Sequence, residues 1–197
     1  MREVELKAVV PDEDEARRRL QAAGAMAVFS GTLIDRRYDT AGRSLTQRDL
    51  VLRLRVQRTA VAERGLLEFK GAASIVDGYK VREEVGTPVD DPAVLASILE
   101  SLGYGVTREV DREVEVYAVA GATVRLERYP RMDLLVEVEG SPEAIEAAIT
   151  ILGVPREAFT AEPLVAFVMR YEARTGQRAA ICTRELDDDF PFRVDDA

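Results

Sequence analysis

The chain has 197 residues, 47% of them hydrophobic and 32% charged, which is typical of a soluble globular protein with a substantial core. Its net charge of −9 argues against binding nucleic acid by general electrostatics, and no apolar run approaches the roughly 20 residues that cross a membrane. Histidine is absent and Cys182 is the single cysteine, which excludes internal disulfides, imidazole acid–base chemistry and cysteine metal clusters.

The first half of the chain combines strand patterns with two helix patterns. Residues 11–24 predict a helix, because Asp12 can cap it, acids fill its first turn and Gly24 can end it. Residues 90–105 predict a second helix, with an aspartate cap, a proline in the first turn and a glycine at the exit. Alternating apolar and polar residues predict strands over 2–10, 25–39 (one strand or two), 50–58, 66–71 and 79–86.

The second half again places strands before helices. About eight strands in all, mostly consecutive within each half, favour an antiparallel α+β fold. From Thr175 onward the polar, acidic sequence predicts a flexible tail, in which Cys182 is expected to be incidental. The elements predicted here are strands over 108–117, 122–128 and 133–139 and helices over 141–153 and 164–174.

The ends and the basic residues of the chain add further expectations. The N-terminus lacks the basic and then apolar pattern of a signal peptide, so we expect a cytoplasmic location with neither a membrane nor nucleic acid as partner. The sequence leaves open whether the protein forms a homodimer. Basic residues are almost all arginine, and lysine occurs only at positions 7, 70 and 80, so each lysine is of interest.

Six of the predicted strands carry charged residues at every second position. Successive strand residues point to opposite faces, so these charges share one face of each strand and apolar residues hold most of the other. A single pair of this kind is typical of an exposed strand face. Because six strands show the same pattern, that explanation would have to hold separately for each of them. The sets are Glu3, Glu5 and Lys7; Arg53 and Arg55; Glu68 and Lys70; Arg82 and Glu84; Arg125 and Glu127; and Glu137 and Glu139.

If the amphipathic helices cover the apolar faces, the charged faces must look toward one another. A dozen charges in a dry core would be prohibitive, so the interior is expected to be a wet tunnel that binds ions. Bases suit a polyanion, and carboxylates without histidine suit Mg²⁺, Mn²⁺ or Ca²⁺, so both together suit a metal–polyphosphate complex. The bases are Lys7, Arg53, Arg55, Lys70, Arg82 and Arg125, and the acids are Glu3, Glu5, Glu127, Glu137 and Glu139.

The order of these motifs resembles the CYTH family, the adenylyl cyclase–thiamine triphosphatase domain whose shape is called a triphosphate tunnel. The hallmark ExExK stands at residues 3–7, followed by YDT, LRLR, a lysine before glycine, RxE and a final ExE. The resemblance runs from Met1 to about Gly153. It implies a closed or nearly closed eight-stranded antiparallel β-barrel with a charged interior, flanked by helices, over residues 1–174, with residues 175–197 as the tail.

The resemblance also implies roles for the charged residues, with one or two Mg²⁺ or Mn²⁺ ions as cofactors. Glu127 stands where the family usually has an aspartate, and either Arg108 or Arg112 matches its next basic motif. The implied metal ligands are Glu3, Glu5, Glu127, Glu137 and Glu139; the implied triphosphate contacts are Lys7, Arg53, Arg55, Lys70, Arg82, Arg112 and Arg125; the implied catalytic residues are Glu5, Lys7, Glu137 and Glu139.

These features predict a metal-dependent phosphohydrolase whose partner is a small-molecule triphosphate, such as tripolyphosphate, thiamine triphosphate or a nucleotide. The first alternative is a class IV adenylyl cyclase, in which the 3′-hydroxyl of ATP attacks the α-phosphorus and pyrophosphate leaves. The second is a non-catalytic module that binds polyphosphate or nucleotides. The YDT motif at residues 38–40 is closer to the phosphatase version of the family and favours hydrolysis.

Overall fold

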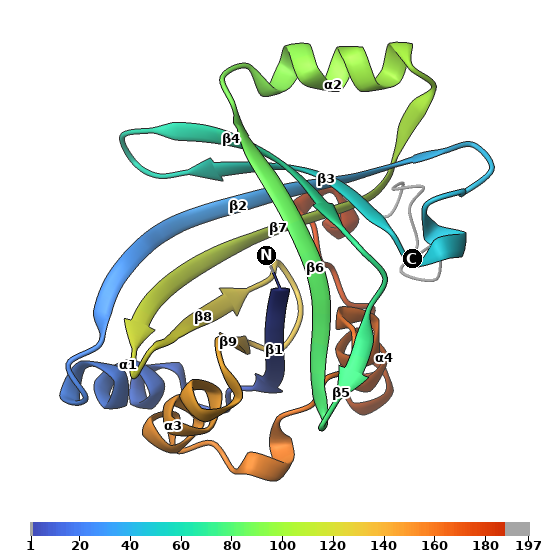
Figure 1. Cartoon of the computed structure of the whole chain (residues 1–197). Coiled ribbons are helices and arrows are strands. Elements are labelled where there is room, and N and C mark those ends of the chain that lie inside the picture. Colours follow the sequence, from blue (N-terminus) through green and yellow to red (C-terminus); the bar gives the residue numbers. More distant parts are fainter. Residues whose placement is uncertain (1, 188–197) are drawn as a thin grey trace.

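The computed structural model describes residues 2–187, in which an antiparallel β-barrel is flanked by four α-helices (Figure 1). The barrel strands, in order round the ring, are β1 (Arg2–Val9), β9 (Leu135–Glu139), β8 (Ala122–Arg128), β7 (Tyr104–Val119), β2 (Met26–Thr40), β3 (Val51–Arg58), β4 (Glu63–Lys70) and β6 (Tyr79–Val89). Pairing of β1 with β6 closes the ring, and the short β5 (Ser74–Val76) pairs with β6 as a ninth strand. The predicted closed eight-stranded barrel of an α+β protein is confirmed.

Three of the helices begin where the sequence offers a side-chain cap. Asp12, Asp91 and Ser141 accept hydrogen bonds from first-turn backbone N–H groups at 2.9, 3.0 and 3.3 Å. No helix within residues 2–187 is long and apolar enough to cross a membrane. The helices are α1 (Glu13–Ala22), α2 (Pro92–Ser101), α3 (Pro142–Leu152) and α4 (Leu164–Thr175).

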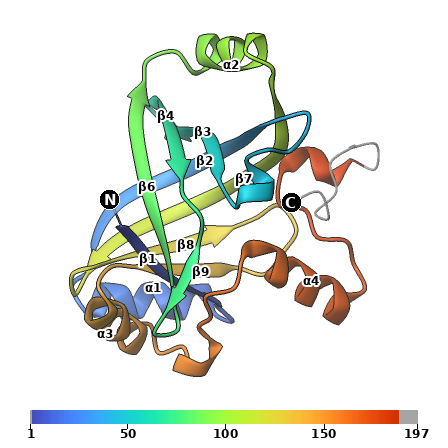
Figure 2. The same ribbon diagram turned by 45° about the vertical axis from the view of Figure 1, so that its right-hand side comes forward.

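The main hydrophobic core lies outside the barrel, between its wall and two helices. Helices α1 and α3 lie together at one end of the molecule and α2 at the other (Figures 1 and 2). Leu6 of β1, Val138 of β9 and Ile145 of α3 belong to one cluster of buried residues with α1. Because side chains alternate along β1 and β9, the charged neighbours of Leu6 and Val138 face the interior of the ring. The structure therefore confirms the prediction that the charged strand faces point into the barrel and the apolar faces point outward, toward the helices.

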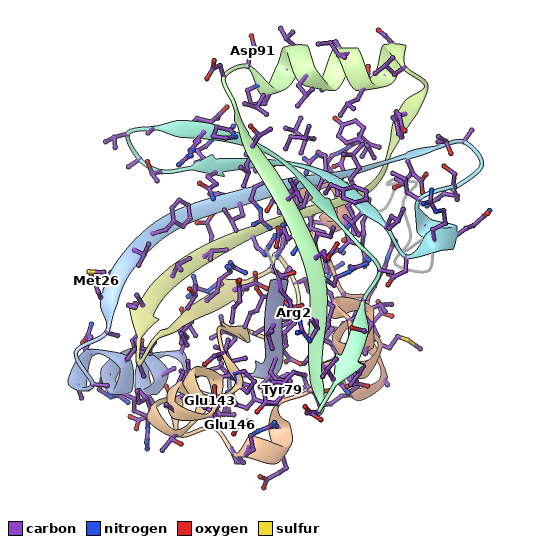
Figure 3. The ribbon with its side chains drawn as sticks, viewed as in Figure 1. Arg2, Met26, Tyr79, Asp91, Glu143 and Glu146 are labelled. Atoms are coloured by element: carbon purple, nitrogen blue, oxygen red, sulfur yellow. The ribbon has the colours of Figure 1, made fainter. Side chains whose placement is uncertain are left out.

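Polar contacts also tie the barrel to its helical cover. The Tyr79 hydroxyl, at the start of β6, donates to Glu146 Oε1 of α3 at 2.6 Å (Figure 3). Arg156 Nε donates to the same carboxylate oxygen at 2.8 Å. These contacts join the start of β6 to α3 and to the chain that follows α3.

The structure corrects the expected tail, because the chain beyond Thr175 packs on the barrel up to residue 187. Ala180 pairs with Arg131 through two backbone hydrogen bonds of 2.8 and 3.1 Å, and Asp111 N donates to Ile181 O at 2.9 Å. Cys182 is fully buried, which raises the pKa of its thiol to about 11 and fits the expectation that it is inert. Residues 188–197 of the predicted tail lie outside the described residues.

Ile145 tests how far the fold depends on the outer core. We expect Ile145→Ala to lower the free energy of unfolding by about 2–5 kcal/mol, because Ile145 is 0% exposed and its truncation leaves a cavity between α3 and the barrel. Urea denaturation followed by circular dichroism measures the loss. Val61→Ala, at a residue 94% exposed, is the control and should stay within about 0.5 kcal/mol of the wild type. Equal losses in the two variants would contradict this account of the core.

Candidate functional site: a charged bore through the barrel

The interior of the barrel is a cavity of about 610 Å³ lined mainly by charged side chains. Within residues 2–187, side chains from all nine strands and from the segment that leads into α4 line it. All the residues proposed from the sequence line it, although their roles stay predictions. They are Glu3, Glu5, Lys7, Arg53, Arg55, Lys70, Arg82, Arg112, Arg125, Glu127, Glu137 and Glu139.

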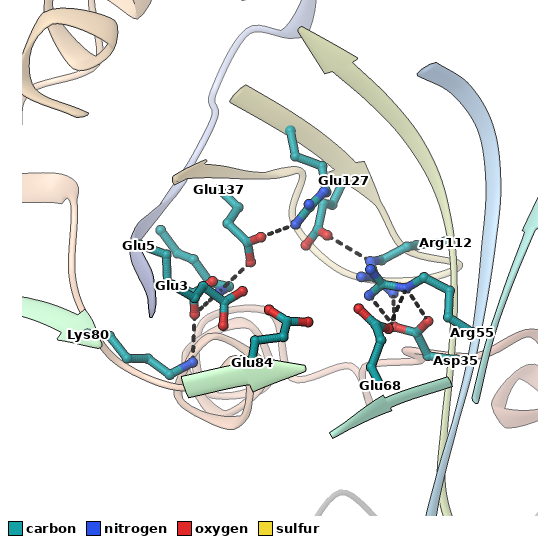
Figure 4. A network of polar contacts seen from close by, with 12 residues as sticks. Glu3, Glu5, Asp35, Arg55, Glu68, Lys80, Glu84, Arg112, Glu127 and Glu137 are labelled. Atoms are coloured by element: carbon teal, nitrogen blue, oxygen red, sulfur yellow. Dashed lines mark hydrogen bonds and ion pairs between the residues drawn. The ribbon is translucent and has the colours of Figure 1, made fainter. Parts of the chain in front are cut away.

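Two opposite walls of the cavity carry different charges. Strand β1 is four places from β2 in the ring of eight, and β9 is four places from β3, so these pairs face each other across the bore. The wall formed by β1 and β9 is called the carboxylate wall and carries Glu3, Glu5, Glu137 and Glu139. The wall formed by β2, β3 and β7 is called the arginine wall and carries Arg37, Arg53, Arg55, Arg108 and Arg112. Figure 4 shows Glu3, Glu5 and Glu137 on one side and Arg55 and Arg112 on the other.

Lysines neutralise the carboxylate wall. Lys7 Nζ lies 2.7 Å from Glu5 Oε1 and 2.6 Å from Glu137 Oε2. Lys80 Nζ donates to the same Glu5 oxygen at 2.6 Å, and Lys70 Nζ lies 2.8 Å from both oxygens of Glu3. Arg125 of β8 also pairs with Glu137. All three lysines of the chain therefore contact this wall, although only Lys7 and Lys70 were proposed from the sequence.

On the arginine wall, the carboxylate of Asp35 joins three guanidinium groups. Its oxygens accept from Arg55 at 2.7 and 2.8 Å, from Arg112 at 3.0 Å and from Arg53 at 3.4 Å. Arg112 Nε donates to Glu127 Oε1 at 2.8 Å. This chain of ion pairs runs from β3 through β2 and β7 to β8, and it holds the guanidinium planes in fixed positions around the bore.

The charges of the bore move the pKa values of its acids in opposite directions. Burial alone would raise the pKa of Glu137, but the charges of Lys7 and Arg125 outweigh burial and hold it well below its usual range. Burial raises the pKa of Glu139, and repulsion by neighbouring carboxylates, including Glu3, adds to the rise. Burial and a hydrogen bond to Glu68 raise the pKa of Glu84 to about 7. The bore therefore contains acids of very different proton affinity.

Several lining residues were missed from the sequence. Lys80 could have been found, because it shares a strand face with Arg82 and Glu84 in β6. Asp35 and Arg37 alternate in β2, but the surrounding DRRYDT sequence shows no clear apolar face. The alternative between Arg108 and Arg112 has a simple answer: four residues apart on one strand, both reach the cavity.

The acids of the bore fit a divalent cation in their chemistry. Within residues 2–187 no three acidic side chains converge as a ready metal cage, because bases engage the oxygens of Glu3, Glu5 and Glu137 one by one. The donors are nevertheless all carboxylate oxygens, which Mg²⁺ and Mn²⁺ prefer. Glu139 stands opposite Glu5 in the sheet register; burial and repulsion by neighbouring carboxylates raise its pKa, and a cation here would relieve that repulsion.

A closed antiparallel barrel with ion-paired acids and bases in its bore defines the class of this protein. A model of the CYTH domain family matches residues 1–156, and the chain belongs to this family. The resemblance noted in the sequence motifs is thus confirmed. Enzymes of the family generally use divalent metal ions. No curated protein matches the chain at a significant level.

Solved structures with this fold include a candidate adenylate cyclase from Vibrio parahaemolyticus, with 20% identity, a TM-score of 0.74 and coverage of 85% of this chain and 97% of that one. The protein PH1819 from Pyrococcus horikoshii OT3 has 24% identity and a TM-score of 0.70, and the match covers 85% of this chain and 98% of that one. A third structure is that of HpAC1 from Hippeastrum, a candidate adenylyl cyclase for which a dominant triphosphatase activity is described. It has 17% identity and a TM-score of 0.59, and the match covers 82% of this chain and 90% of that one. At these identities the likeness shows the fold.

Asp35 tests the electrostatic balance of the arginine wall. We expect Asp35→Asn to lower the free energy of unfolding at pH 7 by about 3–5 kcal/mol, because it leaves buried arginines without their shared partner. Burial would raise the pKa of Asp35, but Arg55, Arg53 and Arg112 hold it well below 3.8. Its stabilisation is therefore complete above pH 4 and is lost as the pH falls further.

Urea denaturation at pH 7 and at pH 3 should show the deficit of Asp35→Asn narrowing at the lower pH. The control is Asp90→Asn, which removes an exposed carboxylate and should change stability by no more than about 0.5 kcal/mol at either pH. A deficit that stays constant with pH would show that the charge of Asp35 is not the source of its contribution.

Proposed function

We propose that the protein is a divalent-metal-dependent phosphohydrolase that binds a triphosphate inside the barrel. The observation that carries the proposal is the enclosure of clustered carboxylates and of lysines and arginines in one cavity of about 610 Å³. Bases alone would suit any anion, and acids alone any cation. The two together suit a polyphosphate whose charge is shared between protein cations and a metal ion.

Within this proposal the carboxylate wall would hold one or two Mg²⁺ or Mn²⁺ ions through Glu3, Glu5, Glu137 and Glu139, with Glu127 beside them. When bound, the metal would supply Lewis-acid chemistry and neutralise phosphate oxygens. Lys7 keeps its proton at all relevant pH values, because its two glutamates raise its pKa despite burial, so it would bind phosphate as a permanent cation. Arg53 and Arg55, held by Asp35, would orient the phosphates from the opposite wall.

In hydrolysis, water attacks the terminal phosphorus, the bond from that phosphorus to the bridging oxygen breaks, and the attacking water loses a proton. A carboxylate of the bore would accept this proton, and Glu137 is poorly suited, because Lys7 and Arg125 outweigh its burial and hold its pKa well below the usual range. No nucleophilic side chain is needed. This agrees with the absence of histidine and with the burial of Cys182 away from the bore.

The class IV adenylyl cyclase is the second candidate, favoured by the structural likeness to the candidate cyclase of Vibrio parahaemolyticus. HpAC1 supports the first candidate, because a triphosphatase activity is described as dominant for that protein. A module that only binds polyphosphate is a third candidate. Against it is the number of carboxylates in the bore, since binding an anion does not require them.

Product analysis separates the three candidates. We expect incubation with tripolyphosphate, ATP or thiamine triphosphate and Mg²⁺ or Mn²⁺ to release orthophosphate, because the bore provides for attack by water. Cyclic AMP with pyrophosphate would instead support the cyclase. A rise in melting temperature with ligand but without any product would support the binding module. Ion chromatography resolves all these products in one run.

Glu137 tests the role of the carboxylate wall. We expect Glu137→Gln to reduce turnover about 100-fold or more, because it removes a proposed metal ligand and the partner of Lys7. The matched control is Glu143→Gln, an exposed position on α3, which should hydrolyse at the wild-type rate. Circular dichroism checks that both variants are folded. Undiminished turnover of folded Glu137→Gln at saturating Mg²⁺ and Mn²⁺ would refute the metal role of this residue.

A further inference from the structure

Within residues 2–187, the side chains of two arginines of the bore, Arg37 and Arg108, form neither a hydrogen bond nor an ion pair. The side chain of Arg37 makes no hydrogen bond or ion pair with any residue between 2 and 187. Arg108 is 9% exposed, and its Nε and Nη2 atoms are buried without a hydrogen-bond partner. Both line the cavity. A buried guanidinium without a partner is costly, so this pair is an exception to the pairing found elsewhere in the bore.

Sheet register places these two arginines side by side on the arginine wall. Arg37 of β2 is paired with Arg108 of β7 on one side and with Arg53 of β3 on the other, so three arginines form a row across neighbouring strands. With strands about 4.8 Å apart, the row spans about 10 Å. Within it, Arg53 is satisfied by Glu68 at 2.8 Å. Burial and the positive charges of Arg108 and Arg53 lower the pKa of Arg37 to about 9, which reflects the excess of positive charge.

We propose that Arg37 and Arg108 form a subsite for one phosphoryl group, the group of a linear phosphate chain that lies farthest from the carboxylate wall. A phosphate oxygen pair matches the planar donor set of a guanidinium, and a group between two arginines would satisfy the donors that now lack acceptors. The proposal deepens the proposed function and rests on it, because it assumes that a phosphate chain enters the bore.

The position of the subsite gives it a selective role. Strand β2 faces β1 across the ring, so the Arg37–Arg108 subsite and the lysines of the carboxylate wall contact the ligand from opposite sides. In this proposal a chain of three phosphates contacts both walls, whereas a pyrophosphate held at the carboxylate wall does not reach the subsite. The subsite would therefore distinguish chain length, through two residues whose side chains form no hydrogen bond or ion pair with the described residues of the bore.

Calorimetric titration with tripolyphosphate and with pyrophosphate tests the subsite, with Mg²⁺ and separately with EDTA. We expect Arg37→Gln and Arg108→Gln each to weaken tripolyphosphate binding about tenfold or more while pyrophosphate binding stays within about twofold of the wild type. The control Arg64→Gln removes the same charge from an exposed position on β4 and should change neither affinity. Wild-type affinity for tripolyphosphate in both subsite variants, or equal losses for the two ligands, would overturn the proposal.

Two further readouts keep the result independent of folding and of turnover. Without ligand, both subsite variants should melt at or above the wild-type temperature, because each removes an unpaired buried charge; a fall of several degrees would show a structural role instead. Loss of chain-length selectivity in the variants, in a protein that releases no product, would refute the hydrolase and keep the subsite. Hydrolysis by the protein, together with unchanged chain-length selectivity in the variants, would keep the hydrolase and refute the subsite. A wild type that binds neither ligand under either condition would refute both.

Discussion

The structure depends on charge pairing inside a closed ring of strands. Among residues 2–187, ten basic and nine acidic side chains line the bore, so their total charge is close to zero even though the local charge is high. Removing one partner from a buried pair costs several kcal/mol, whereas the pair itself is close to neutral for stability. The network around Asp35 shows the rule, since one carboxylate serves three arginines from two neighbouring strands. The interior is thus a set of mutually dependent positions, which favours one arrangement of the strands.

This interior requires the hydrophobic core to lie elsewhere. In a small barrel the apolar faces usually fill the inside, whereas here they turn outward and need cover. Helices α1 and α3 provide that cover over β1, β8 and β9, and α4 packs through Phe167 and Val168 near Leu135 of β9. The strands that carry most of the carboxylates are therefore the best supported. The charged groups of the carboxylate wall thus project from strands whose outer faces are buried against helices.

The sequence was most informative where side chains alternate strictly. In strands such as β3 and β9 a period of two, with apolar residues between the charges, assigned the inward residues correctly. The rule fails in β2, where DRRYDT has polar residues on both faces and a register shift follows Arg37, so Asp35 and Arg37 were missed. Alternation also cannot separate Arg108 from Arg112, because residues four apart on a strand point to the same face. The two differ in their contacts, since Arg112 forms ion pairs and Arg108 has buried nitrogen atoms without a hydrogen-bond partner among residues 2–187. The packed segment beyond Thr175 was missed because its few apolar residues give no periodic pattern.

The pairing of the carboxylate wall has a consequence for any ligand of the bore. A cation that takes oxygens from Glu5 and Glu137 leaves Lys7 with fewer partners, and an anion that takes Lys7 leaves two buried glutamates bare. Each exchange alone creates unpaired buried charge, whereas both together restore pairing on every group. Within the proposed function, binding of a metal ion and of a polyanion would therefore be thermodynamically coupled, and by linkage each would raise the affinity of the other by the same factor. The ion pairs of the bore would thus favour the metal–polyanion complex over either component alone.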